Sequence, residues 1–157
     1  MELDFRAASL ADLPTIVELL SALGLPVAGV EEHIANFLLT FQEGSLVACA
    51  GLERYGATAL LRSVAVAERH RGEGLAHRLV AQLIDIARAD GIESLLLLTI
   101  TAAGFFQRFG FRMISRDEAP AAVQSSIQFQ GVCPASATLM RLFLRLPETV
   151  HQSTRST

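Results

Sequence analysis

The sequence predicts a single α/β domain built on a mixed sheet of about seven strands. Apolar runs of strand length alternate with segments whose apolar residues recur at helical spacing. The run 59–67 leads through a helix-like segment, 74–90, into a second run at 94–99, which predicts a right-handed βαβ unit with two parallel strands. A chain of 157 residues with 51% hydrophobic residues can bury one sizeable core.

The first part of the chain predicts one strand, one helix and then three antiparallel strands. Residues 3–7 alternate as a strand. Ser9, with Asp12 three positions later, resembles a capping box ahead of a helix that ends at Gly24. The three antiparallel strands, with turns between them, are predicted at 37–41, 46–52 and 59–67.

The second part predicts helices and strands that alternate after the amphipathic helix 74–90. The unbroken apolar run Leu95–Leu98 is typical of a central strand that is covered on both faces. The remaining predicted elements are a short helix at 101–109 and strands at 111–115 and 138–146.

An insertion, 116–137, separates the last two predicted strands. It is long for a connection between paired strands, and acidic residues ahead of a proline predict a helix within it over 121–129. We expect the folded domain to span 1–146 and a polar tail to span 147–157.

Composition and charge exclude several classes of function. The net charge of −3 and the pI near 5.8 provide no basic field that would hold nucleic acid. No apolar run reaches the length of a membrane helix, and the first residues lack the features of a signal peptide. Cys49 and Cys133 lie far apart and form no metal-ligand spacing. We therefore expect a cytoplasmic protein with no metal and with neither nucleic acid nor membrane as partner.

The connection between strand 59–67 and helix 74–90 predicts an anion site. A strand that leads into a helix through a glycine turn presents free backbone N–H groups at the positive end of the helix dipole. Arg69 and Arg71 add positive charge, and Gly72 and Gly74 allow a ligand to approach the backbone closely. This arrangement favours a phosphate-containing ligand, above all a pyrophosphate.

Two other phosphate-binding motifs do not match this chain. The sequence contains no G-x-x-x-x-G-K-[ST], which excludes a P-loop. A dinucleotide fingerprint would need Gly or Ala where His77 stands, and three antiparallel strands precede the glycine turn.

The motif Arg69-x-x-Gly72-x-Gly74, directly after a Val-x-Val strand, resembles the acyl-CoA pyrophosphate loop of the GNAT family of N-acetyltransferases. The order of elements through Phe109-Gly110-Phe111 is similar to that family along nearly the whole chain. The resemblance implies a V-splayed sheet with helices on both faces. It also implies that acetyl-CoA donates an acetyl group to the primary amine of a small amino-acid-like molecule by direct attack in a ternary complex, and that a homodimer can form. The alternative is an acetyl-CoA-binding module without catalysis.

The same resemblance implies which residues contact acetyl-CoA. Two of the matching positions depart from the usual family pattern, since Phe106 stands where a tyrosine usually protonates the departing thiolate and Thr99 stands where an asparagine is frequent. The implied acetyl-CoA contacts are Val64, Val66, Arg69, Arg71, Gly72, Gly74, Leu75, Thr99 and Phe106.

Two branches of the family are more similar still. The segment 101–111 and Ser136 resemble the acetyltransferase domain of bacterial N-acetylglutamate synthases, although that branch usually carries a glutamate near Leu60 and arginines just before the serine. The segments 60–66, 116–120 and 133–137 resemble small acetyltransferases encoded beside arsenic-resistance genes. This second resemblance implies a role in arsenic-related detoxification.

The residues that contact the acceptor are less clearly indicated, and each candidate has an alternative. Glu53 is the candidate base or amine anchor, unless it is a solvated charge at a strand end. Arg62, with Ser63 beside it, is the candidate contact for the substrate carboxylate, unless the arginine extends to the surface. Ser136 is the candidate donor to the thiolate or a substrate contact, unless it is an ordinary loop serine. Cys133 is a weaker candidate as an arsenic ligand.

Overall fold

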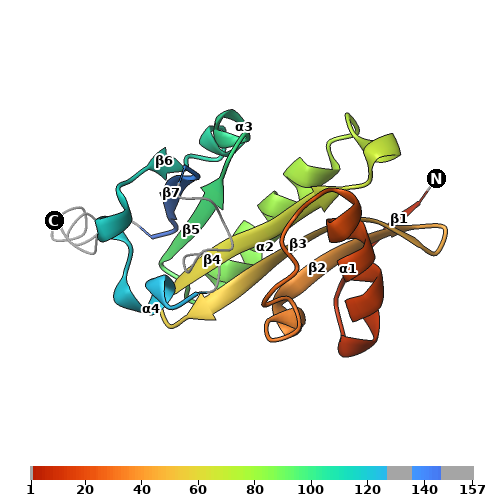
Figure 1. The fold of residues 1–157 in the computed structure, drawn as a ribbon, viewed down its shortest axis with the longest axis horizontal. Coiled ribbons are helices and arrows are strands. Elements are labelled where there is room, and N and C mark those ends of the chain that lie inside the picture. The colour runs from red at the N-terminus through yellow and green to blue at the C-terminus, as the bar shows by residue number, and fades with distance from the viewer. Residues whose placement is uncertain (1, 127–135, 146–157) are drawn as a thin grey trace, which may run out of the picture.

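A mixed sheet of seven strands runs through the part of the chain that the computed structural model describes, residues 2–126 and 136–145 (Figure 1). Its strand order is β1-β2-β3-β4-β5-β7-β6, and among these neighbours only β4 and β5 are parallel. The predicted mixed sheet with one βαβ unit is therefore confirmed. The strands are β1 (Leu3–Ala7), β2 (Phe37–Gln42), β3 (Ser45–Tyr55), β4 (Thr58–Val66), β5 (Ser94–Thr99), β6 (Arg112–Met113) and β7 (Thr138–Phe143).

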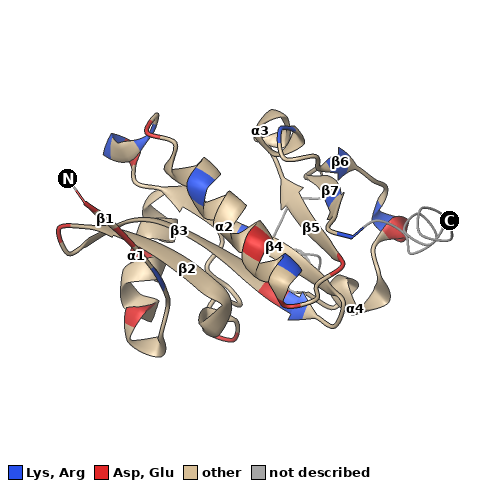
Figure 2. Ribbon diagram, turned by 180° about the vertical axis from the view of Figure 1, so that it is seen from behind, with Lys and Arg blue, Asp and Glu red and all other residues tan. Residues whose placement is uncertain are grey.

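Helices cover both faces of this sheet, as the family resemblance implied. α2 (Leu75–Ala89) packs its apolar side against Leu38, Ala48 and their neighbours, and its charged side faces outward in Figure 2. α1 (Leu13–Ala22) packs on the opposite face of the sheet. It contacts the strand residues whose side chains point to that face, such as Leu39 and Cys49. Within the described residues, no helix is both long and apolar enough to cross a membrane.

β4 and β5 diverge after a short stretch of pairing, and this divergence creates the space for the site. Their parallel register begins at Thr58 and Ser94 and ends after four pairs, at Leu61 and Leu97. Beyond that point β4 continues to Val66, and among the described strands it pairs there with β3 alone. The V-shaped splay implied by the resemblance is thus present between the two parallel strands.

A β-bulge in β4 lies directly beyond the point of divergence. Between the pairs Cys49–Ala65 and Gly51–Arg62, β3 has one residue and β4 has two, Ser63 and Val64. Ser63 adopts a left-handed backbone conformation with φ of 58°. The bulge therefore changes the direction of the side chains on β4 at the entrance of the splay.

Several predicted elements are shorter in the structure, for reasons visible in their hydrogen bonds. The helix predicted at 101–109 is α3 (Ala103–Gln107), which begins after the Thr99 hydroxyl oxygen accepts a bond from the Ala102 N–H. The strand predicted at 111–115 is reduced to β6, because buried Phe111 packs in the core and Ser115 caps a turn through Glu118.

The insertion also contains less helix than its sequence predicts. Its helical part is α4 (Ala121–Gln124), preceded by one 3₁₀ turn at Arg116–Glu118. The end of the helix predicted over 121–129 and the predicted tail at 147–157 lie outside the described residues.

We predict that Asp12→Asn lowers stability mainly above pH 4. Asp12 accepts hydrogen bonds from Arg6 at 2.9 and 3.0 Å and from the Ser9 N–H at 2.8 Å, and these bonds lower its pKa to about 2. A carboxyl group whose pKa is depressed by folding stabilises the fold above its unfolded pKa, and this contribution is lost as the pH falls toward 2. Urea unfolding at pH 7 should show a loss of about 1 kcal/mol, and the loss should shrink as the pH approaches 2.

Asp4→Asn is the matched control, because Asp4 is an exposed carboxylate on the same strand as Arg6. Its effect at pH 7 should be smaller than that of Asp12→Asn. A loss for Asp12→Asn that stays the same from pH 7 to pH 2 would contradict the prediction.

Candidate functional site

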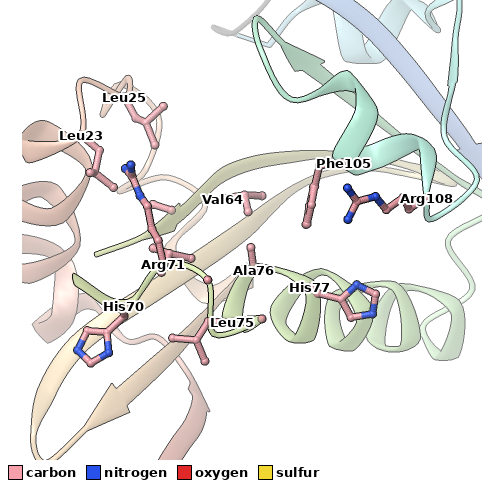
Figure 3. Close-up of a pocket in the computed structure, with 14 residues that line it drawn as sticks. Leu23, Leu25, Val64, His70, Arg71, Leu75, Ala76, His77, Phe105 and Arg108 are labelled. Atoms are coloured by element: carbon pink, nitrogen blue, oxygen red, sulfur yellow. The ribbon is translucent and has the colours of Figure 1, made fainter. Parts of the chain in front are cut away.

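Two cavities join into one groove along β4. The first, the loop cavity, encloses about 510 Å³ between β4, the glycine turn, the start of α2 and α3 (Figure 3). The second, the splay cavity, encloses about 710 Å³ where β4 and β5 diverge. Leu25, Val64, Ala76 and Phe105 line both cavities, so the two spaces adjoin each other. The groove therefore leads from the glycine turn into the opened sheet.

The glycine turn has the geometry that its sequence predicts. Gly72 and Gly74 have φ of 82° and 78°, and Gly74 caps the start of α2. A Cβ atom added to either glycine would meet nothing within 4 Å, so the surrounding packing does not require glycine here. The backbone conformation does require it, and the open space leaves room for a ligand to contact the backbone. The first intrahelical bond of α2 is from the Arg78 N–H to Gly74 at 3.1 Å, so the preceding amides can bind an anion.

Positive charge reaches the loop cavity from two sides. Arg71 extends from the turn toward Leu23 and Leu25, and Arg108 extends from the end of α3 toward Phe105 (Figure 3). Arg69 is exposed and does not line either cavity, although the sequence placed it in the site. Sequence analysis assigned no role to Arg108, because its place in the loop cavity depends on how α3 packs relative to the turn.

The other predicted acetyl-CoA contacts divide between the two cavities. Thr99 and Phe106 line the splay cavity, where the Phe106 ring is almost fully buried. Val64 lines both cavities, as stated above, and the contacts that line the loop cavity alone are Val66, Arg71, Gly72, Gly74 and Leu75.

A buried polar cluster lies beside the splay cavity, centred on Glu53. Arg62 Nη1 donates to Glu53 Oε2 at 2.7 Å, and the side chains of both residues are 1% exposed. The hydroxyl groups of Tyr55 and Ser126 each donate a hydrogen bond to Glu53 Oε1 at 2.6 Å. His33 Nε2 lies 3.9 Å from the same oxygen. The carboxylate is therefore surrounded by donors from β3, β4 and the insertion, just after α4.

Arg62 also contacts groups at the wall of the splay cavity. Its Nε donates to the Ser63 hydroxyl at 3.0 Å, and its Nη2 donates to the Pro26 carbonyl at 3.4 Å. All three residues line the cavity. The alternatives of a solvated Glu53 and of a surface arginine are both wrong, because the two side chains form a buried pair.

The cluster keeps Glu53 in its charged form. Burial alone would raise the pKa of this carboxyl, but the hydrogen bonds from Ser126, Tyr55 and Arg62 and the charge of Arg62 more than compensate, so its pKa is lowered. Burial and the bond to Glu53 raise the pKa of Tyr55 to about 12. At neutral pH the cluster therefore holds a carboxylate, a guanidinium and a neutral phenol.

Sequence reasoning missed part of this cluster, although the hairpin carried a signal for it. Glu53 and Tyr55 share one face of β3, and Arg62 is diagonal to Glu53 because Glu53 pairs with Leu60. The register of the hairpin could thus have paired Glu53 with Arg62. Ser126 had no comparable signal, since it follows α4 far along the chain.

The structure does not bring the last predicted catalytic residue into the groove. Ser136 is exposed and lines neither cavity, although its neighbour Ala137 is buried and lines the splay cavity. Cys133 lies outside the described residues. The catalytic roles of Glu53 and Ser136 stay predictions.

Two proteins of known sequence are similar to this chain. An amino-acid acetyltransferase of Mannheimia succiniciproducens is 30% identical over 136 residues, which cover 81% of this chain and 31% of that protein. An uncharacterized N-acetyltransferase of Chlorobaculum tepidum is 30% identical over 95 residues, which cover 60% of this chain and 61% of that protein. This chain thus spans about a third of the first relative and three fifths of the second.

Solved structures share the fold. N-acetylglutamate synthase from Neisseria gonorrhoeae, in complex with coenzyme A and N-acetyl-glutamate, matches with a TM-score of 0.78 and 26% identity over 93% of this chain and 36% of that one. A Mycobacterium tuberculosis protein solved with CoA matches with a TM-score of 0.75 and 23% identity over 90% of this chain and 99% of that one. The second match concerns the fold alone.

The match to a family model covers the elements that build the groove. The model of the acetyltransferase (GNAT) family matches residues 17–111, from α1 through the glycine turn to Phe111. With the splayed sheet and the open glycine turn, this match leads to one conclusion: the chain belongs to the acetyltransferase (GNAT) family.

Proposed function

We propose that the protein transfers an acetyl group from acetyl-CoA to the primary amine of a small amino-acid-like molecule. The observation that carries this proposal is the groove of two adjoining cavities, one at the glycine turn and one between two diverging strands. Such a groove can hold a long ligand that is anionic at one end and reactive at the other.

The loop cavity fits the pyrophosphate half of the donor. The amides of Gly72, Gly74 and Leu75 would hold the pyrophosphate, and Arg71 would balance its charge. The backbone of Val64 and Val66 would pair with the pantetheine arm, since β4 has no partner on its β5 side beyond Leu61 within the described residues. The thioester would then reach the splay cavity past Val64.

The splay cavity supports an acceptor that carries a carboxylate beside its amine. Arg62 has five N–H donors, and the described contacts use three of them. The remaining donors can bind an acceptor carboxylate from the cavity wall. The amino-acid acetyltransferases among the relatives and the N-acetyl-glutamate bound in the solved synthase support this acceptor class.

The reaction we propose is direct attack in a ternary complex. The neutral amine nitrogen bonds to the thioester carbonyl carbon, the C–S bond breaks, the nitrogen loses a proton and the departing sulfur gains one. Glu53 as base and Ser136 as donor to the sulfur are the candidates from the sequence. The geometry supports Glu53 more strongly as the residue that fixes Arg62, because its oxygens already accept three hydrogen bonds.

Three finer statements stay predictions: a role in arsenic-related detoxification, a homodimer and a cytoplasmic location. The second candidate function, an acetyl-CoA-binding module without catalysis, is favoured by Phe106 at the usual tyrosine position and by the exposed Ser136. Release of free CoA in the presence of amines separates this candidate from the enzyme.

We predict that free CoA is released with amino acids and more slowly with the corresponding amines that lack the carboxylate. Arg62→Lys keeps a positive charge beside Glu53 but loses the planar guanidinium. It should raise KM for the amino acid about tenfold, with KM for acetyl-CoA nearly unchanged. Equal increases for both substrates would remove Arg62 from the acceptor site, and binding of acetyl-CoA without CoA release for any amine would overturn the enzyme proposal.

We predict that Gly72→Glu abolishes acetyl-CoA binding while the domain stays folded. Gly72 has φ of 82° and open space around it, so the new carboxylate enters the space intended for the pyrophosphate. Gly56→Glu is the matched control, because Gly56 has φ of 68°, similar open space and a place in the turn between β3 and β4. Calorimetric titration should show loss of binding for Gly72→Glu alone; retained affinity would refute the pyrophosphate site.

A further inference from the structure

We propose that the Ser63 hydroxyl donates a hydrogen bond to the thioester carbonyl oxygen and stabilises the negative charge that develops there. This inference rests on the proposed function and adds a residue role to it. The reaction itself is unchanged: the C–N bond forms, the C–S bond breaks, and Ser63 keeps its proton.

The backbone at Ser63 is strained in a place where no turn requires it. Two non-glycine residues among those described have positive φ, Glu43 at 52° and Ser63 at 58°. Glu43 lies in the turn between β2 and β3, where a left-handed conformation closes the hairpin. Ser63 lies within β4, at the bulge. Strain of this kind persists where the surrounding structure enforces it, and it is concentrated at functional sites.

The surroundings of Ser63 fix its backbone and leave its hydroxyl proton available. Cys49 Sγ donates to the Ser63 carbonyl at 3.3 Å, and Arg62 Nε donates to the Ser63 hydroxyl oxygen at 3.0 Å. Within the described residues, the hydroxyl makes no further hydrogen bond, so its proton can be donated into the cavity. A charged donor on the oxygen polarises the O–H bond and strengthens the bond that it donates.

The position of Arg62 is fixed in turn by Glu53. The guanidinium is 1% exposed and bonded to a carboxylate that also accepts bonds from Tyr55 and Ser126. A side chain held in this way cannot follow the Ser63 hydroxyl if that group moves. Arg62 and Glu53 are therefore positioning residues for Ser63.

Ser63 also lies where the donor carbonyl must pass. It lines the splay cavity, and the next residue, Val64, lines both cavities at their junction. The side chain of Phe106, which lines the same cavity, offers no hydrogen-bond donor. A hydroxyl at the junction is thus suited to meet the carbonyl of a thioester whose pantetheine arm follows β4.

The experiment compares three substitutions at Ser63 in the full chain. Ser63→Gly removes the hydroxyl and should lower kcat about 100-fold, with the affinity for acetyl-CoA nearly unchanged. Asn and Asp both tolerate a left-handed backbone, and both can accept the bond from Arg62. Ser63→Asn also supplies N–H donors, whereas Ser63→Asp supplies none when ionised. We expect the Asn variant to be at least about tenfold faster than the Asp variant.

A control variant tests whether relief of backbone strain at another residue changes turnover. Glu43→Gly relieves the other strained non-glycine residue and should leave turnover unchanged. Turnover of Ser63→Gly close to that of the unsubstituted protein, or equal turnover of the Asn and Asp variants, would overturn the proposal.

A second measurement needs no acceptor. A hydrogen bond lowers the carbonyl stretching frequency, so the infrared band of bound acetyl-CoA labelled with ¹³C at the carbonyl should move to higher frequency in Ser63→Gly. An unchanged band would overturn the role of Ser63 even if the acceptor were never found. Absence of any acetyl-CoA binding by the unsubstituted protein would instead overturn the proposed function.

Discussion

The buried ion pair between Glu53 and Arg62 is the interaction on which the wall of the splay cavity depends. A pair of this kind adds little net stability, because the cost of removing two charges from water is comparable to their attraction. Loss of one partner is far more costly, about 3–5 kcal/mol, because the other charge is left buried without compensation. The pair therefore makes the local structure specific: β3, β4 and the residue after α4 must meet at one carboxylate.

The two cavities of the groove are built in different ways. Its loop cavity is built from backbone geometry, since the positive φ of the glycines and the start of α2 create the anion site with few side chains. Its splay cavity is built from side chains, since Arg62 and Ser63 owe their orientation to a bulge and to a buried carboxylate. The family match over residues 17–111 covers the glycine turn and also Glu53, Arg62 and Ser63, whereas Ser126, which completes the buried cluster, lies beyond it.

The sequence predicted the sheet, the βαβ unit and the glycine turn because each depends on local patterns. Alternation marked β1, the turns between successive runs marked β2 to β4, and the apolar run Leu95–Leu98 marked β5. The lengths of α3 and β6 could not be predicted, because a cap at Thr99 and a turn at Ser115 set them.

The residues of the site were predictable from the sequence to different degrees. Glu53 and Arg62 were chosen as separate candidates for contact with substrate, and their mutual bond needed the register of the hairpin. Ser126 reaches Glu53, and Arg108 reaches the loop cavity, only through tertiary packing, which no local pattern encodes.

The bond between Ser126 and Glu53 has a consequence for folding order. It joins residues that are 73 positions apart, and β5 likewise receives its second neighbour, β7, from beyond the insertion. Closing loops of this length costs conformational entropy before the contacts compensate it. During synthesis the carboxylate on β3 emerges long before its last donor, so β3 and β4 can pair first while the buried cluster around Glu53 is completed late.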